Sequence, residues 1–233
     1  MHIIRYIPNT ITCLNLVSGC IACVMALEGN LFGAMLWIII ASVFDFCDGL
    51  AARLLKAYSP LGKELDSLGD VVSFGVAPGM MLFCTIKTWG EAAAIEGIGA
   101  YLPFIAFIVP AFSGLRLAKF NIDERQTTSF IGLPVPAHAL LWASACYSLQ
   151  PFIESGACWI MPALIIAFCF TSYLLVSEIP MFSLKAKSLG WEGNELRYIL
   201  IFCTVGFIIC FGFLGISGAI LLYIILSVFN ARR

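Results

Sequence analysis

The sequence predicts an all-α integral membrane protein, built as one domain over residues 1–233 with roughly eight transmembrane helices. Three observations support this fold class. Hydrophobic residues make up 61% of the chain and charged residues only 12%, which is too little charge to cover a soluble domain of this size. Apolar segments of roughly 20 residues, enough to cross a bilayer, alternate with short polar connections. Basic residues also gather on one predicted side of the membrane.

The expected helices follow one another with short connections. They span 9–28, 31–56, 64–88, 98–120, 134–152, 157–177, 196–212 and 215–230. Asn9 stands at the start of the first, and a Ser59-Pro60 turn joins the second to the third as antiparallel neighbours. Pro134 suits the first turn of the fifth helix. The glycines at 212 and 215 favour a hairpin between the last two, because the whole apolar run is too long for one span.

The basic residues fix the expected orientation. With eight spans and a cytoplasmic N-terminus, 12 of the 13 lysines and arginines lie inside and only Lys87 lies outside. The inside set is Arg5, Arg53, Lys56, Lys63, Arg116, Lys119, Arg125, Lys185, Lys187, Arg197, Arg232 and Arg233. We therefore expect a multi-pass protein of the cytoplasmic membrane with both termini in the cytoplasm. The net charge of −1 gives no reason to expect nucleic-acid binding.

Four of the five aspartates fall in one short stretch at bilayer depth, where each charge costs about 2.5–3.5 kcal/mol on insertion scales. Asp45 and Asp48 are spaced i,i+3 near the cytoplasmic end of the second helix. Asp66 and Asp70 are spaced i,i+4 near the cytoplasmic start of the third. Because the two helices are antiparallel neighbours, the four carboxylates are expected to converge on one cavity. This cavity would open to the cytosol, so that a site built on the carboxylates would face the cytoplasm.

Four carboxylates in one cavity would repel each other unless cations were present. Oxygen-only ligation suits Mg²⁺, Mn²⁺ or Ca²⁺, and two such ions suit a diphosphate. Gly49 and Ala52 leave room for a bulky group on the same helix face, and Arg53 can reach a phosphate. Too few basic residues lie nearby for the carboxylates to be structural ion pairs. A cation or proton pathway is a second interpretation, although the carboxylates cluster at one face instead of crossing the bilayer.

The stretch from Asp45 to Asp70 reads D-x2-D-G-x2-A-R-x8-G-x3-D-x3-D without a substitution. It resembles the signature of the CDP-alcohol phosphotransferases. The resemblance implies a membrane transferase of phospholipid biosynthesis that uses two divalent cations, Mg²⁺ or Mn²⁺. It implies metal binding by Asp45, Asp48, Asp66 and Asp70, with Asp70 also the catalytic general base. The incoming hydroxyl would attack the phosphorus that carries the lipid, and CMP would leave.

The resemblance also implies that Gly49 and Arg53 contact the CDP moiety, with Ser59 as a further donor. An amide at Asn9 can hydrogen-bond a base or ribose beside the same cytoplasmic mouth. The predicted binding set for CDP-diacylglycerol is Asn9, Thr12, Gly49, Ala52, Arg53, Ser59 and Gly62.

Three flanking segments, 7–19, 113–121 and 130–136, resemble phosphatidylserine synthases of bacteria and archaea. The resemblance covers about the first 140 residues and implies L-serine as the acceptor. Arg116 suits the carboxylate of serine, and Lys119 and Asn121 complete the predicted acceptor set. Lys119 stands where arginine is commoner in the family, so its charge is kept without the bidentate fork. Basic anchoring at the membrane surface is the alternative for Arg116 and Lys119.

Other acceptors remain open at this point. Glycerol 3-phosphate, inositol phosphate or another small alcohol would undergo the same chemistry, and Arg116, Lys119, Arg125 and Arg197 could serve a second phosphate. Only the flanking segments favour serine. The family resemblance also suggests a homodimer.

Overall fold

The computed structural model describes residues 6–123, 130–155, 159–182, 190 and 194–231. Within them the chain is almost entirely helical, which confirms the predicted all-α membrane fold. The helices are α1 (Tyr6–Leu27), α2 (Leu31–Leu54), α3 (Pro60–Asp70), α4 (Ala77–Ala92), α5 (Ile108–Ile122), α6 (Val135–Glu154), α7 (Ile160–Val176), α8 (Glu195–Phe211) and α9 (Leu214–Ala231). A π-helical segment, η2 (Val71–Val76), joins α3 to α4, and a 3₁₀ segment, η3 (Gly97–Phe107), leads into α5. Two short strands, β1 (Phe130–Ile131) and β2 (Pro180–Met181), pair antiparallel.

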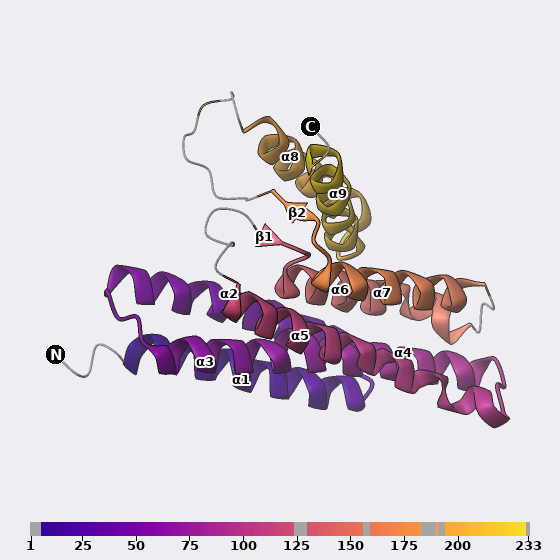
Figure 1. Cartoon of the computed structure of the whole chain (residues 1–233). Helices are drawn as coiled ribbons and strands as arrows, with labels where there is room; N and C mark the ends of the chain where they lie inside the picture. Colours follow the sequence, from indigo (N-terminus) through magenta and orange to yellow (C-terminus); the bar gives the residue numbers. More distant parts are fainter. Residues whose placement is uncertain (1–5, 124–129, 156–158, 183–189, 191–193, 232–233) are drawn as a thin grey trace.

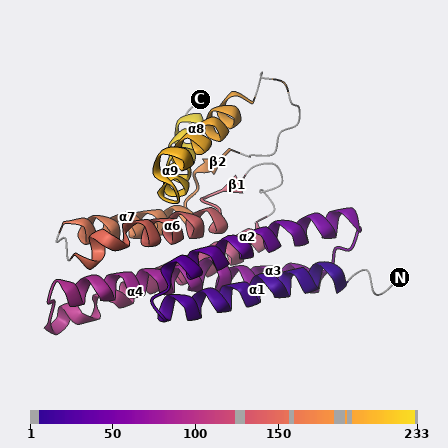
Figure 2. The same ribbon diagram turned by 180° about the vertical axis from the view of Figure 1, so that it is seen from behind.

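Helices α1 to α7 run side by side, and the α8–α9 hairpin crosses them at a steep angle on the side of α6 and α7 (Figures 1 and 2). The core lies between the long helices, where Met35, Ile38, Phe74, Met81 and Phe168 are fully buried. Ser217 of α9 fastens the hairpin to α6, because its hydroxyl lies 2.6 Å from the Ser144 hydroxyl and donates to the Leu141 carbonyl at 2.9 Å.

By length and hydropathy, four helical segments of the described chain can each cross a bilayer. They are Tyr6–Leu27, Leu31–Leu54, Pro60–Ala92 and Gly97–Ile122, and α7 and α9 are shorter apolar helices. The eight-span count and the cytoplasmic placement of both termini stay predictions. Six of the counted basic residues lie outside the described residues, namely Arg5, Arg125, Lys185, Lys187, Arg232 and Arg233.

Three expected helix starts were wrong. The first helix begins at Tyr6 and not at 9, so Asn9 lies within its first turn. The third helix begins at Pro60 and not at 64, because the Ser59 hydroxyl caps it by accepting from the Gly62 amide at 3.0 Å, with proline in the first turn. The fourth expected helix begins as the 3₁₀ segment, which contains Pro103, and becomes α-helical only at Ile108. Proline lacks the N–H that an α-helix interior needs. The hairpin at Gly212 is confirmed, and this glycine has a φ of 58°, which a side chain would strain.

Candidate active site between α1, α2 and α3

The connection between α2 and α3 brings the aspartates together. At the end of α2 the chain turns through Lys56, whose φ of 50° is left-handed, and the Ala57 amide donates back to the Ala52 carbonyl at 3.0 Å. Ser59 then caps α3. Asp48 lies six residues before the end of α2 and Asp66 six residues after the start of α3, so both stand about 9 Å inside the turn at ~1.5 Å per residue.

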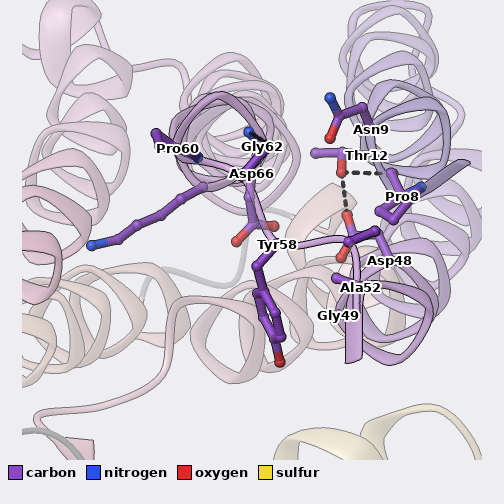
Figure 3. Close-up of a pocket in the computed structure, with 13 residues that line it drawn as sticks. Pro8, Asn9, Thr12, Asp48, Gly49, Ala52, Tyr58, Pro60, Gly62 and Asp66 are labelled. Carbon is purple, nitrogen blue, oxygen red and sulfur yellow. Dashed lines mark hydrogen bonds between the residues drawn. The ribbon is translucent and has the colours of Figure 1, made fainter. Parts of the chain in front are cut away.

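Asp45, Asp48 and Asp66 form a cluster in which one carboxylate oxygen from each residue lies within 4.8 Å of the others. Figure 3 shows Asp48 and Asp66 projecting into the same space from facing helices. Asp66 Oδ1 is buried and has no hydrogen-bond partner among the described residues. A buried carboxylate oxygen without a donor needs a compensating positive charge. The residues therefore fit a divalent cation with oxygen ligands.

Asp70 lies beside this cluster but outside it. Its side chain is buried, with 7% exposed, and Oδ1 accepts a hydrogen bond from Asn15 Nδ2 of α1 at 3.1 Å. It interacts electrostatically with Asp45, Asp66 and Asp48. The four predicted aspartates thus occupy one region, with three close enough to share an ion and the fourth held by an amide.

A cavity of about 590 Å³ opens between α1, α2 and α3, and Asp48 and Asp66 lie in its wall (Figure 3). The wall includes six of the seven residues predicted to bind the lipid nucleotide: Asn9, Thr12, Gly49, Ala52, Ser59 and Gly62. Nothing stands within 4 Å of the position where a Cβ of Gly49 would lie, so this glycine keeps the space open. Thr12 Oγ1 contacts Asp48 Oδ2 at 2.6 Å and the Pro8 carbonyl at 3.0 Å, both acceptors for its single proton.

Arg53 is the predicted nucleotide-binding residue that does not line the cavity. Its side chain is exposed, and Nε donates to the Gly49 carbonyl one turn earlier at 2.9 Å. Sequence reasoning missed two polar residues of the wall, Tyr58 and Lys63. Their position inside the signature, between Arg53 and Asp66, was the available signal. From the sequence, Lys63 was expected only among the basic residues near the cytoplasmic ends of these helices.

Of the three predicted acceptor residues, Arg116 is the one whose charge interacts with the aspartates. It is buried, with 7% exposed, and interacts electrostatically with Asp70 and Asp45. Its guanidinium carbon lies 5.1 Å from the centre of the Phe120 ring. Its Nε has no hydrogen-bond partner among the described residues.

Lys119 and Asn121 are engaged in contacts between elements. Lys119 Nζ forms an ion pair with Glu178 Oε1 at 2.9 Å. Asn121 Nδ2 donates to the Ser67 hydroxyl at 2.8 Å, and its carbonyl accepts from Lys63 Nζ at 3.1 Å. These bonds tie the end of α5 to α3 and to the segment after α7.

Comparison with known proteins identifies the family of the chain. A family model described as CDP-alcohol phosphatidyltransferase matches residues 5–182. The CDP-diacylglycerol–serine O-phosphatidyltransferase of Bacillus subtilis is 36% identical over 180 residues, covering 75% of this chain and 89% of the relative.

The names of two further relatives also include serine. The enzyme of the same name from Mycobacterium leprae is 33% identical, covering 76% of this chain and 58% of that relative. The archaetidylserine synthase of Methanothermobacter thermautotrophicus is 31% identical, covering 74% of this chain and 68% of that relative.

Proposed function

The chain belongs to the CDP-alcohol phosphatidyltransferase family, and from this premise we propose that it transfers the phosphatidyl group of CDP-diacylglycerol to L-serine, giving phosphatidylserine and CMP. The observation that carries the proposal is the carboxylate cluster of Asp45, Asp48 and Asp66. Two of its members, Asp48 and Asp66, line a cavity large enough for a nucleotide. Membership of the family makes the chain a transferase, and the acceptor and the detailed mechanism belong to the proposal.

Asp45, Asp48 and Asp66, with Asp70 beside them, would hold two divalent cations, Mg²⁺ or Mn²⁺. Such ions neutralise negative charge on the diphosphate and on the departing CMP. The small residues Gly49 and Ala52 admit the CDP group, Asn9 and Ser59 supply hydrogen-bonding groups at the cavity wall, and Gly62 and Thr12 shape it. Arg53, on the face of α2 just beyond Gly49, would turn toward a phosphate when the nucleotide is bound.

The serine hydroxyl then attacks the phosphorus that bears the lipid. A bond forms between the serine oxygen and phosphorus, the bond from phosphorus to the CMP oxygen breaks, and Asp70 takes the hydroxyl proton. Arg116 is buried and its charge interacts with that of Asp70, and its planar fork suits the carboxylate of serine. We assign Lys119 and Asn121 to the wall of this acceptor site, where Glu178 and Ser67 hold them.

Serine is favoured over a phosphorylated acceptor for two reasons. The relatives named above act on serine by name. In addition, Glu178 neutralises Lys119, which lowers the positive charge available to a second phosphate near Arg116. The transporter alternative is disfavoured because the clustered aspartates lie at one end of their helices and do not line a path across the bundle.

The membrane setting completes the proposal. The distribution of basic residues supports a multi-pass protein of the cytoplasmic membrane whose active site faces the cytoplasm. One domain over residues 1–233 would carry the whole activity, and the family resemblance supports a homodimer.

The proposal is tested by incubating the purified protein in detergent with CDP-diacylglycerol, radiolabelled serine and Mn²⁺ or Mg²⁺. Label is expected in the organic phase as phosphatidylserine, and chelation of the metal should abolish it. Label that stays in the aqueous phase under every metal condition would refute serine transfer.

A further inference from the structure

Helix α1 carries two buried polar side chains one turn apart, and each contacts an aspartate of a different helix. Thr12 contacts Asp48 of α2, and Asn15 donates to Asp70 of α3. The signature residues all lie on α2 and α3, so α1 supplies groups that the signature does not contain. Asn15 has no exposed surface, although an amide buried inside a protein is costly unless it is hydrogen-bonded.

The direction of the Asn15 amide is fixed by its surroundings. Nδ2 lies 3.1 Å from Asp70 Oδ1, whereas its own Oδ1 is buried without a hydrogen-bond partner among the described residues. Turning the amide over would place two acceptor oxygens against each other and lose the donor. The arrangement is therefore one in which the amide donates to the carboxylate, and the second oxygen of Asp70 stays free of this bond.

The backbone around both residues is also held. The Ser73 hydroxyl donates to the Asn15 carbonyl at 2.9 Å, and a Cβ added to Gly19 would lie 2.6 Å from Ser73 Cα. This close approach packs α1 directly against η2, the π-helical segment that begins at the residue after Asp70. Short π-helical insertions shift the register of a helix and often occur at functional sites. Asp70 thus stands at a register shift, with Asn15 as its fixed hydrogen-bond donor.

We propose that Asn15 is a positioning residue for the transfer reaction, because its amide holds Asp70 Oδ1 and directs the other carboxylate oxygen toward the attacking hydroxyl. The inference rests on the proposed function, in which Asp70 takes the proton. An amide is suited to this task because it orients a carboxylate without bringing a charge that would pair with it. Small errors in the placement of a reacting group cost large factors in rate.

The test compares Asn15→Asp with Asn15→Ala in the full-length protein. Aspartate keeps the volume of asparagine but replaces the donor by an acceptor, whereas alanine removes both volume and donor. We expect Asn15→Asp to lower kcat by about 100-fold or more and Asn15→Ala by about 10-fold or more, with the KM for CDP-diacylglycerol within about 3-fold of the wild-type value. Ser18→Ala is the matched control, because Ser18 is buried on the same helix and its hydroxyl donates to the Leu14 carbonyl of that helix.

A packing role predicts the opposite order, with Asn15→Asp close to wild type and Asn15→Ala impaired, and that order would overturn the inference. If Asn15→Asp fails to fold, Asn15→Ala decides the matter by itself. A folded Asn15→Ala protein whose kcat stays within about 3-fold of the wild-type value would overturn the inference. Full activity of Asp70→Asn would refute the general-base role in the proposed function. If Asp70→Asn is inactive while both Asn15 variants keep the wild-type kcat, only the positioning role of Asn15 is refuted.

Discussion

Lys119 Nζ lies 2.9 Å from Glu178 Oε1, so the basic residue at the end of α5 is paired with an acidic residue that follows α7. The pair joins two segments that are 59 residues apart in the sequence. It also separates the roles of two neighbouring basic residues. Lys119 forms an ion pair with Glu178, whereas Arg116, one turn earlier, interacts electrostatically with Asp70 and Asp45.

Lys119→Gln is therefore expected to leave the KM for serine within about 3-fold of the wild-type value and to cost less than about 1 kcal/mol of stability. The ion pair is partly exposed, with 37% and 64% of the two side chains accessible, and such pairs contribute little. Serine kinetics and thermal unfolding in detergent measure both effects. A rise in the serine KM of tenfold or more would instead make Lys119 a direct ligand of the acceptor.

Arg116→Ala is expected to raise the KM for serine by about 10- to 100-fold, the range of a lost hydrogen bond to a charged group. The KM for CDP-diacylglycerol should change far less. Arg116→Lys keeps the positive charge but loses the planar fork, so its KM for serine should lie between those of the wild type and Arg116→Ala. Equal effects on both substrates, or none on serine, would return Arg116 to an anchoring role at the membrane surface.

The metal requirement should follow the carboxylate cluster. Asp66→Asn removes a negative charge from the position whose buried oxygen has no donor in the described structure. We expect the Mn²⁺ concentration for half-maximal activity to rise by at least about tenfold. Glu64→Gln, an exposed residue on the same helix, is the control and should leave the metal titration unchanged. An unchanged titration in Asp66→Asn would remove this residue from the metal site.

Gly19→Ala tests the contact between α1 and the π-helical segment. The added methyl group would meet the Ser73 backbone, where neither helix can give way easily, so we expect a loss of about 1–3 kcal/mol and reduced activity. Gly206→Ala in α8 is the matched control, because nothing lies within 4 Å of the added Cβ there. It should raise thermal stability slightly. Equal stability of the two variants would show that the close packing at Gly19 is not needed.

The sequence predicted the helices well because each has a long apolar run bounded by polar, glycine or proline residues. The four aspartates were brought together by helical spacing and one short turn, both of which are local in the sequence. The start of α3 was wrong because Ser59 and Pro60 were assigned to a turn, although they are a strong capping pair for a helix.

The remaining features depend on contacts between distant segments. Asn15 meets Asp70 across 55 residues, and Lys119 meets Glu178 across 59. The π-helical segment after Asp70 changes the helical register over a single short stretch. A periodic pattern of apolar residues does not reveal so short a change. These features decide which oxygen of Asp70 is free and which basic residue faces the acceptor, so they are the part of the site that needed a structure.

Serine transfer is tested by measuring CMP release from CDP-diacylglycerol with Mn²⁺, in parallel reactions with serine, glycerol 3-phosphate, inositol 1-phosphate or no acceptor. We predict release that serine alone stimulates and that Asp70→Asn abolishes while binding of CDP-diacylglycerol persists. Release stimulated by a different alcohol, or by none of them, would contradict it.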